Sequence, residues 1–273
     1  MTINCKGTLV DLSTPKVMGI LNITPDSFYD GGKYKNASDI LKQTEKMLSE
    51  GATFIDVGAY SSRPGAKHIS QEKELQRILP VINLLLKNFP DIILSVDTFR
   101  SKIAQETVLA GAAIINDISG GKMDENMFKT VAKLQVPYIL MHMLGTPQNM
   151  QKNPVYKDVN KEIITFFAEQ IFKLHQLKQN DIIIDMGFGF GKTIAHNYEI
   201  LKNLALYKSL DAPILAGISR KSMLYKTLDI SAQEALNATT SANTIALLNG
   251  ANILRVHDVK EATEAIKIVN QVL

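Results

Sequence analysis

Short, unbroken runs of β-branched and other apolar residues recur along the whole chain, each followed by a polar turn and then by a segment with helical periodicity. A run without apolar–polar alternation is typical of a strand that is covered on both faces. Parallel strands of this kind need helical crossovers, and eight strand–helix units spaced about 30 residues apart close naturally into a barrel. The sequence therefore predicts an α/β protein with the architecture of a (β/α)8 TIM barrel.

The eight predicted strands are residues 17–21, 53–57, 92–96, 112–115, 138–141, 182–184, 213–217 and 252–256. The helices that follow them are expected at residues 38–50, 70–88, 101–110, 124–134, 158–178, 197–208, 233–248 and 260–272. A weak alternation around Lys6-Gly7 predicts an N-terminal hairpin within residues 1–15. Because no linker-like or low-complexity stretch divides the chain, residues 1–273 are expected to form a single domain.

The overall charge argues against partners that are recognised by a strong electrostatic field. Thirty Lys and Arg residues against 27 Asp and Glu leave a net charge of +3, so neither nucleic acid nor a membrane surface is expected as a partner. The one cysteine, Cys5, allows no internal disulfide, which favours a reducing compartment. No targeting pattern or membrane-length apolar run is found. We therefore expect a cytoplasmic protein.

Polar residues follow every predicted strand, at the carboxyl ends where barrel enzymes build their active sites. In chain order these positions hold Asn22, Ser61–Arg63, Asp97, Asn116, His142, Asp185, Ser219–Ser222 and Arg255–His257. Each of them taken alone is explained equally well as a cap of the next helix. Asp97, Asn116 and Asp185, however, precede their predicted helices by several residues and are too far away to cap them. The set therefore predicts an active site at this end of the barrel.

The turn after Asp185 is the most unusual of these loops. Glycines occupy every second position in it, so that the backbone can turn sharply and lie flat against a ligand. It ends in Gly191-Lys192-Thr193, which resembles the end of a P-loop, but Met186 stands where that motif needs its first glycine. The sequence therefore indicates a glycine-rich turn that is not a P-loop, and this turn either only connects the strand to the next helix or also lies against a ligand.

The residue types at the strand ends suit two kinds of ligand group. Asp97, Asn116 and Asp185 offer acceptors and an amide to a flat heterocycle that carries amino and lactam groups. Lys221 can neutralise one carboxylate or donate to a ring carbonyl. Strands one, two and eight become neighbours when the barrel closes, and they contribute a set that suits a phosphate-type anion, namely Asn22, Ser62, Arg63, Arg255 and His257. No His, Cys or Asp cluster has metal-ligand spacing, although a magnesium ion bridged by a diphosphate needs few protein ligands.

Motifs in order along essentially the whole chain resemble those of the dihydropteroate synthase family. They are Asn22-Ile-Thr-Pro-Asp-Ser-Phe-Tyr-Asp-Gly-Gly, Ser61-Ser-Arg-Pro-Gly65, Ser95-Val-Asp-Thr98, Asn116-Asp-Ile-Ser-Gly-Gly121, Met141-His-Met143, Asp185-Met-Gly-Phe-Gly-Phe-Gly-Lys192, Gly217-Ile-Ser-Arg-Lys-Ser222 and Arg255-Val-His-Asp-Val259. The resemblance implies a transferase of folate biosynthesis. Such an enzyme joins 6-hydroxymethyl-7,8-dihydropterin diphosphate to 4-aminobenzoate, giving 7,8-dihydropteroate and diphosphate.

The resemblance also implies roles for individual residues. The pterin is expected to contact Asp97, Asn116, Ile118, Met141, Asp185, Phe190, Gly217 and Lys221. The diphosphate is expected to contact Asn22, Ser62, Arg63, Arg255 and His257. The aminobenzoate is expected to contact Arg63, Pro64, Phe190, Lys221 and Ser222. The residues expected to carry catalysis are Asp97, Asp185, Lys221 and Arg255.

Further properties follow from the same resemblance. Mg²⁺ is the expected cofactor, with Asn22 as its protein contact, the chain is expected to form a homodimer, and sulfonamides are expected to compete with the aminobenzoate. The electron-rich dihydropterin and the weakly nucleophilic amine both favour breaking the C–O bond first, in a dissociative, SN1-like displacement. The second loop departs from the family pattern, which usually has glutamate and threonine where this chain has Tyr60 and Ser62. These changes remove a charge and a methyl group.

Three alternatives fit the same barrel. A pterin-dependent methyltransferase shares the pterin pocket but has no diphosphate to hold, so Arg63, Arg255 and His257 argue against it. A Schiff-base aldolase would use Lys221 as its nucleophile. A pterin-binding protein without activity is the third alternative, although every expected polar position is filled.

Overall fold

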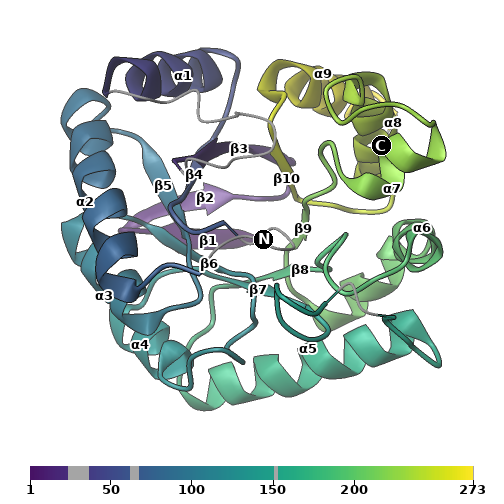
Figure 1. Ribbon diagram of the computed structural model, residues 1–273, viewed down its shortest axis with the longest axis horizontal. Coiled ribbons are helices and arrows are strands. Elements are labelled where there is room, and N and C mark those ends of the chain that lie inside the picture. The colour runs from purple at the N-terminus through teal and green to yellow at the C-terminus, as the bar shows by residue number, and fades with distance from the viewer. Residues whose placement is uncertain (24–36, 62–67, 151–152, 273) are drawn as a thin grey trace.

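The computed structural model describes residues 1–23, 37–61, 68–150 and 153–272 of the chain. Its central strands are β3 (Lys16–Asn22), β4 (Phe54–Gly58), β5 (Ile93–Asp97), β6 (Ile114–Asp117), β7 (Tyr138–Met141), β8 (Ile182–Asp185), β9 (Ile214–Ala216) and β10 (Ile253–Val256). They pair in parallel and close into a barrel in the order β10-β3-β4-β5-β6-β7-β8-β9. Figure 1 shows this barrel end-on, ringed by helices. The predicted (β/α)8 TIM barrel is confirmed.

The helices of the outer ring are α1 (Ala37–Ser49), α2 (Gln71–Asn88), α3 (Ser101–Ala110), α4 (Met127–Leu134), α5 (Val159–Gln176), α6 (Ile194–Lys202), α7 (Ser222–Thr227), α8 (Leu236–Leu248) and α9 (Val259–Val269). Within the described residues, no helix is long and apolar enough to cross a membrane.

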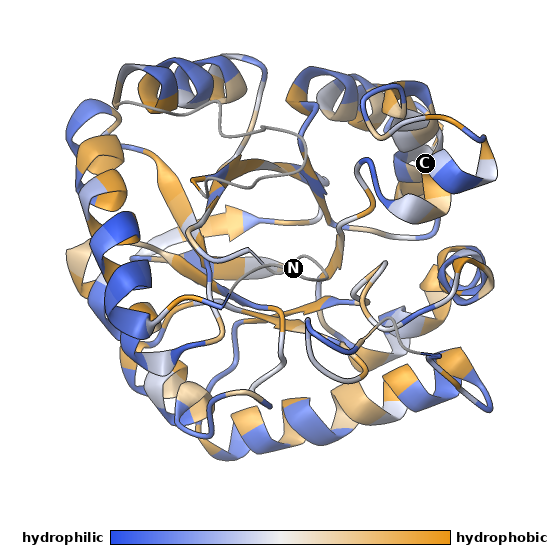
Figure 2. Cartoon of the chain, viewed as in Figure 1, coloured by the Kyte–Doolittle hydropathy of each residue, from blue (hydrophilic) through white to orange (hydrophobic). Residues whose placement is uncertain are grey.

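In Figure 2 the helices carry blue, polar stretches around the outside of the ring, whereas orange, apolar stretches dominate the strands.

The segment predicted as one helix over residues 197–208 is divided in two. α6 begins earlier, at Ile194, because the Thr193 hydroxyl accepts a hydrogen bond from the His196 amide while the Thr193 amide donates to the His196 ring. A 3₁₀ helix, η1 (Leu204–Leu210), then follows. The short helix α7 was not predicted from the sequence, because six residues are too few to show a helical period.

The strands are covered on both faces, as the absence of alternation indicates. Along β8, the side chain of Ile183 packs in the cluster inside the barrel, while Ile182 and Ile184 belong to the larger cluster between strands and helices. All three side chains are buried. The apolar run therefore fills two separate cores at once.

The predicted N-terminal hairpin is present as β1 (Thr2–Cys5) and β2 (Thr8–Asp11), an antiparallel pair. Its buried residues pack with the first interior layer of the barrel, in a cluster formed by Ile3, Cys5, Val10, Leu12, Met18, Phe54, Ala113, Ile114, Ile139, Ile183, Leu215 and Ile253. The Asn4 amide donates to Asp181 at 2.9 Å, and the Asn252 side chain donates to the Leu12 carbonyl at 3.0 Å. The hairpin thus covers the end of the barrel at which the strands begin.

We predict that Leu12→Ala lowers the free energy of unfolding by about 2–5 kcal/mol, because it removes a fully buried side chain and leaves a cavity under the barrel. Urea denaturation measures this change. The matched control is Leu9→Ala, the same substitution on the same hairpin at a position that is 69% exposed. It should change the free energy by less than about 0.5 kcal/mol. Equal losses in both variants would contradict the packing described.

Candidate active site

The predicted strand-end residues meet at the opposite end of the barrel. β5 ends at Asp97, β8 ends at Asp185, and Asn116 is the next-to-last residue of β6. The parallel register places Asp97 beside Gly58 on one side and beside Asn116 on the other. These polar side chains therefore lie at similar heights around the mouth of the barrel.

Arg255 on β10 reaches across the barrel and binds two carboxylates. Its Nε donates to Asp56 Oδ2 at 2.7 Å, and its Nη2 donates to Asp97 Oδ2 at 3.1 Å. Asp56 also accepts a hydrogen bond from the Asn116 side-chain amide at 2.9 Å. Residues from four strands, β4, β5, β6 and β10, are thus joined in one polar network.

Burial and neighbouring charges shift the pKa values of the two predicted carboxylates. Loss of solvent raises the pKa of Asp97 to about 7, although the Arg255 guanidinium opposes the shift. Loss of solvent also raises the pKa of Asp185, opposed by the Lys221 ammonium and by the Gly187 amide, which donates to Asp185 at 2.8 Å. For Arg255, burial disfavours the charged form, yet Asp56 and Asp97 raise its pKa overall. The network therefore holds a guanidinium in place under the site.

Lys221 lies on the other side of the mouth, just before α7. Its ammonium donates to the Phe188 carbonyl and sits 4.9 Å from the centre of the Phe190 ring. Burial lowers its pKa to about 8, opposed by the nearby Asp185 carboxylate. A Cβ at Gly217 would lie 3.7 Å from Asp185 Oδ2 and 3.8 Å from Lys221 Nζ, so this glycine leaves the space beside both groups unfilled.

Apolar side chains from five loops pack together above the polar residues. This cluster contains Tyr60, Phe99, Ile118, Met141, Met143 and Met150, and the half-buried side chains of Ile69, Met123 and Phe190 pack against it. Three residues predicted as apolar contacts of the pterin are therefore neighbours: Ile118, Met141 and Phe190. They form one wall of the mouth.

The glycine-rich turn after β8 is held by a buried lysine. The Lys192 ammonium donates to the carbonyls of His142, Gly187 and Phe190 at 3.0–3.2 Å, and it also lies 3.1 Å from the His142 ring nitrogen Nδ1. Burial lowers the pKa of Lys192 well below its ordinary value, opposed by Asp185. At Gly187 a Cβ would lie 2.0 Å from the His142 carbonyl oxygen, so this close approach requires glycine. The turn is thereby fixed with Phe190 beside Lys221.

Several buried polar atoms near the barrel mouth have no hydrogen-bond partner within the described part of the chain. They are Asp56 Oδ1, Ser95 Oγ and Asn116 Oδ1. Such groups are rare in folded proteins, because a buried acceptor without a donor costs about 1–3 kcal/mol. A heterocycle that bears amino and N–H groups supplies donors of the matching kind.

The residues predicted to hold an anion lie on the β10, β3 and β4 side of the mouth. A Cβ at Gly58 would lie 3.3 Å from Asn22 Oδ1 and 3.8 Å from Asp97 Oδ2, so this glycine leaves the space between the two side chains unfilled. The Ser219 hydroxyl lies 3.0 Å from His257 Nδ1 and accepts from the His257 amide at 3.2 Å. Ser222 is the first residue of α7. Three more predicted residues, Ser62, Arg63 and Pro64, lie outside the described residues.

The side chains at the mouth offer few ligands for a magnesium ion. Among the residues that the structure describes, no group of three His, Cys, Asp or Glu side chains could hold a metal. The Asn22 amide oxygen at the end of β3 is the kind of ligand that Mg²⁺ accepts, and the ion usually completes its shell with water and substrate phosphates. The residues present therefore fit an ion that a diphosphate brings with it.

Tyr60, which departs from the family pattern, packs at the base of the second loop. Its ring makes an edge contact with Phe99, with the centroids 5.0 Å apart, and its hydroxyl lies 3.1 Å from His68 Nδ1. The Arg100 guanidinium lies 5.4 Å from the centre of the ring. Residues on both sides of segment 62–67 are thus joined.

Arg100 itself is anchored by an ion pair inside the protein. Its guanidinium binds the carboxylate of Glu74, which is fully buried on α2, and also donates to the Ile69 carbonyl at 2.6 Å. Glu74 further accepts from the Thr98 hydroxyl at 2.8 Å. Burial raises the pKa of Glu74, opposed by Thr98 and Arg100. The absence of glutamate at position 60 therefore does not leave this region without a carboxylate.

Sequence reasoning missed three polar residues of the site region. Asp56 was included in an apolar strand, although a carboxylate inside such a run is itself a signal of a buried ion pair. Lys192 stands in a segment whose recognisable pattern is only the end of a P-loop, which gives no sign of its carbonyl partners. Arg220 stands in a loop, and its partners Asp258 and Ala232 lie 38 and 12 residues further along the chain.

The comparisons with known proteins agree with this geometry. The model of a family described as "Pterin binding enzyme" matches residues 18–257. The dihydropteroate synthase of Escherichia coli strain K12 is 42% identical over 275 residues, which cover 100% of this chain and 97% of that protein. The dihydropteroate synthase of Haemophilus influenzae is 40% identical, covering 98% of each chain.

Solved structures give the same result. A Yersinia pestis dihydropteroate synthase with a sulfonamide drug complex superimposes with a TM-score of 0.96 at 43% identity, covering 100% of this chain and 99% of that one. A Xanthomonas albilineans dihydropteroate synthase with 4-aminobenzoic acid superimposes with a TM-score of 0.91 at 36% identity, covering 99% and 97%. These relations favour the synthase over the methyltransferase and aldolase alternatives. The chain belongs to the dihydropteroate synthase family of pterin-binding enzymes.

Proposed function

We propose that the polar mouth of this barrel carries out the synthase reaction of its family, the transfer of a dihydropterin from its diphosphate to 4-aminobenzoate. The observation that carries the proposal is the pairing of two carboxylates, the partly buried Asp97 and the buried Asp185, with two cations, Arg255 and Lys221, beside buried acceptors that lack donors. This combination suits a heterocycle with several N–H groups that acquires positive charge. All of residues 1–273 are proposed to act as one pterin-binding domain.

The pterin is proposed to lie between the carboxylates and the apolar wall. Asp185 accepts from neighbouring ring N–H groups, Asn116 and Asp97 face the opposite edge, and Lys221 donates to the ring carbonyl. Ile118, Met141 and Phe190 cover the flat faces, while Gly217 leaves room for close approach. Asp56, although absent from the sequence-based set, supports this pocket because it holds both Asn116 and Arg255.

The diphosphate is proposed to bind on the β10, β3 and β4 side. Arg255 and His257 come from one strand end and Asn22 from its neighbour, and Ser62 and Arg63 are proposed to join them. Mg²⁺ is proposed as the cofactor, held by Asn22 and supplying charge neutralisation to the departing diphosphate. The protein's own cations contribute to the same neutralisation through charge-assisted hydrogen bonds.

The aminobenzoate is proposed to bind beside Phe190, Lys221 and Ser222, with Arg63 and Pro64 on the other side. Sulfonamides are proposed to compete for this position. Two relatives support the assignment: one structure is described as a sulfonamide drug complex and another as containing 4-aminobenzoic acid. The start of α7 at Ser222 and the turn that carries Phe190, which Lys192 holds, are proposed to border this position.

The reaction is proposed to break the C–O bond before the amine attacks. Asp97 and Asp185 lie in a partly desolvated mouth, where fixed negative groups stabilise a developing pterin cation strongly. Arg255 and His257 hold the leaving diphosphate. The amine of the aminobenzoate then forms the C–N bond and loses a proton, so that no covalent enzyme intermediate is needed.

A cytoplasmic homodimer is proposed as the working form. Helix α8 contains no charged residue and exposes Ile245 and Leu248. An uncharged helix face with exposed apolar side chains is a surface that a second copy of the chain can cover. The single, buried Cys5 is consistent with a reducing compartment.

The proposed reaction is tested by mixing the protein with the pterin diphosphate, with and without 4-aminobenzoate. We expect diphosphate release together with an equal amount of dihydropteroate only when both substrates are present. Diphosphate release without any coupled product would contradict the proposal.

We predict that Asp185→Ala weakens the binding of a pterin analogue by about 1–3 kcal/mol, or roughly five- to 150-fold, because ring donors lose their acceptor in a buried site. Isothermal titration calorimetry measures it. Asp181→Ala is the matched control, since Asp181 lies just before the same strand at the opposite end of the barrel and contacts the hairpin. An unchanged affinity in Asp185→Ala would remove this residue from the pocket.

The pH dependence of kcat/KM tests the charge state of Lys221. Burial lowers the pKa of this lysine to about 8, so the ammonium is present below pH 8 and is lost above it. If the ammonium binds substrate, kcat/KM falls as the pH rises through about 8, and Lys221→Arg, which stays charged, abolishes that fall. A Schiff-base mechanism needs the neutral amine and predicts the reverse trend.

Isotopes test the order of bond breaking. Oxygen-18 in the bridging position of the diphosphate substrate should scramble into non-bridging positions when an unreactive aminobenzoate analogue replaces the second substrate. The secondary deuterium isotope effect at the reacting methylene should be clearly above unity, because that carbon becomes trigonal in the transition state. An effect close to unity, with chemistry rate-limiting, would favour direct displacement.

A further inference from the structure

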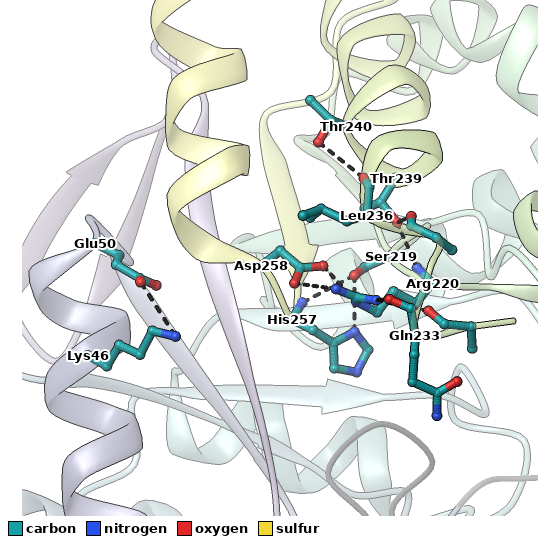
Figure 3. A network of polar contacts seen from close by, with 12 residues as sticks. Lys46, Glu50, Ser219, Arg220, Gln233, Leu236, Thr239, Thr240, His257 and Asp258 are labelled. Carbon is teal, nitrogen blue, oxygen red and sulfur yellow. Dashed lines mark hydrogen bonds and ion pairs between the residues drawn. The ribbon is translucent and has the colours of Figure 1, made fainter.

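We propose that Arg220 and Asp258 form a latch that positions Lys221 and His257 relative to each other. The latch residues are positioning residues: each precedes or follows a site residue in the chain and contacts the other loop. Figure 3 shows Arg220 reaching Asp258 and the neighbourhood of Gln233, with Ser219 and His257 directly beside this ion pair. The effect of the latch on kcat/KM rests on the proposed function, whereas its effect on the position of the His257 ring does not.

The backbone of Arg220 has an unusual conformation. Its φ is +54°, in the left-handed region that residues other than glycine seldom adopt. The Arg220 amide donates to the Thr239 hydroxyl on α8 at 3.0 Å, which fixes the turn from outside. Such a conformation persists only where surrounding contacts impose it. The contacts of the Arg220 side chain supply that constraint.

The guanidinium of Arg220 donates four hydrogen bonds. Its Nε and Nη2 donate to the two oxygens of Asp258, each at 2.8 Å, in a bidentate pair. Its Nη1 donates to the carbonyls of Ala232 and Gln233 in the segment before α8. The two side chains are 6% and 12% exposed, so solvent weakens the pair little. The loops after β9 and β10 and the segment before α8 are therefore tied at one point.

The latch lies next to a second connection between the same loops. Ser219, one residue before Arg220, contacts both the ring and the amide of His257, one residue before Asp258. Lys221, one residue after Arg220, reaches the opposite way, to the Phe188 carbonyl. Asp258 stands at the N-cap of α9, but its side chain caps no amide there and is used for Arg220 instead. These contacts thus connect His257, which is proposed to hold the diphosphate, to the loop that carries Lys221, which is proposed to hold the pterin.

Two substitutions separate the parts of the latch. Arg220→Gly removes the guanidinium but suits the left-handed backbone, so it tests the ion pair without adding backbone strain. Asp258→Asn keeps the size of the side chain and removes its charge, and it serves if the glycine variant fails to fold. Leu12→Ala is the control for lost stability, because it acts on the hairpin at the far end of the barrel. All proteins are studied as full chains at a temperature at which circular dichroism shows them folded.

Two readouts are compared. The first is kcat/KM for both substrates, expected to fall at least about tenfold in both latch variants and to stay within about twofold in Leu12→Ala. The second is the ring-nitrogen spectrum of His257 in the ligand-free protein, recorded by ¹H–¹⁵N NMR and assigned with His257→Asn. Its Nδ1 signal should move in the latch variants, because its distance to the Ser219 hydroxyl changes, and should be unchanged in Leu12→Ala.

The outcomes are distinct. Wild-type kcat/KM together with an unmoved His257 signal in folded Arg220→Gly and Asp258→Asn would overturn the latch. A fall in kcat/KM in all three variants in proportion to their lost stability would also overturn the latch, because the ion pair would then only stabilise the fold. If the wild-type protein forms no dihydropteroate, the proposed function fails, and the His257 signal in the latch variants still decides whether the latch exists.

Discussion

The guanidinium of Arg255, held between Asp56 and Asp97 inside the barrel, is the interaction on which the rest of the site depends. Removing charges from water is costly, and a buried ion pair often contributes less to stability than apolar residues of the same volume would. Its presence in the interior of an otherwise apolar barrel is therefore better explained by function. Together with the Asn116 amide, these three charged groups join four strands and hold one cation in a fixed position under the mouth.

The surrounding loops are organised in the same way, each by one buried cation. Lys192 gathers three carbonyls of the turns after β7 and β8, Arg100 joins both ends of the second loop to Glu74, and Arg220 ties the last two loops together. A cation with several donors can satisfy carbonyls from separate segments at once, which an apolar side chain cannot do. Loops without regular hydrogen bonding thereby acquire defined conformations around the site.

The sequence contained most of the fold, because the strands are continuous apolar runs and the barrel follows from eight of them. The conformations of the loops could be predicted less well. The helix α7 and the 3₁₀ segment η1 are too short or too irregular to show a period, and the capping box at Thr193 uses His196 where Glu or Gln is usual. The strand-end position of Asp97, Asn116 and Asp185 could be predicted from the order of residues alone. The partners of Asp56, Lys192 and Arg220 could not, because they lie up to 199 residues away in the chain.

The hairpin under the barrel has a consequence for how the chain reaches its native state. One of its hydrogen bonds involves a residue that is synthesised late: the Leu12 carbonyl accepts from the side chain of Asn252, 240 residues further along the chain. β3, the first barrel strand, likewise waits for β10 before its free edge is paired. Contacts between such distant residues form slowly, and an unpaired strand edge is prone to associate with other chains. The edge of β3 and the Leu12 side of the hairpin therefore lack these partners until β10 and Asn252 have been synthesised, and over that period the exposed strand edge favours aggregation.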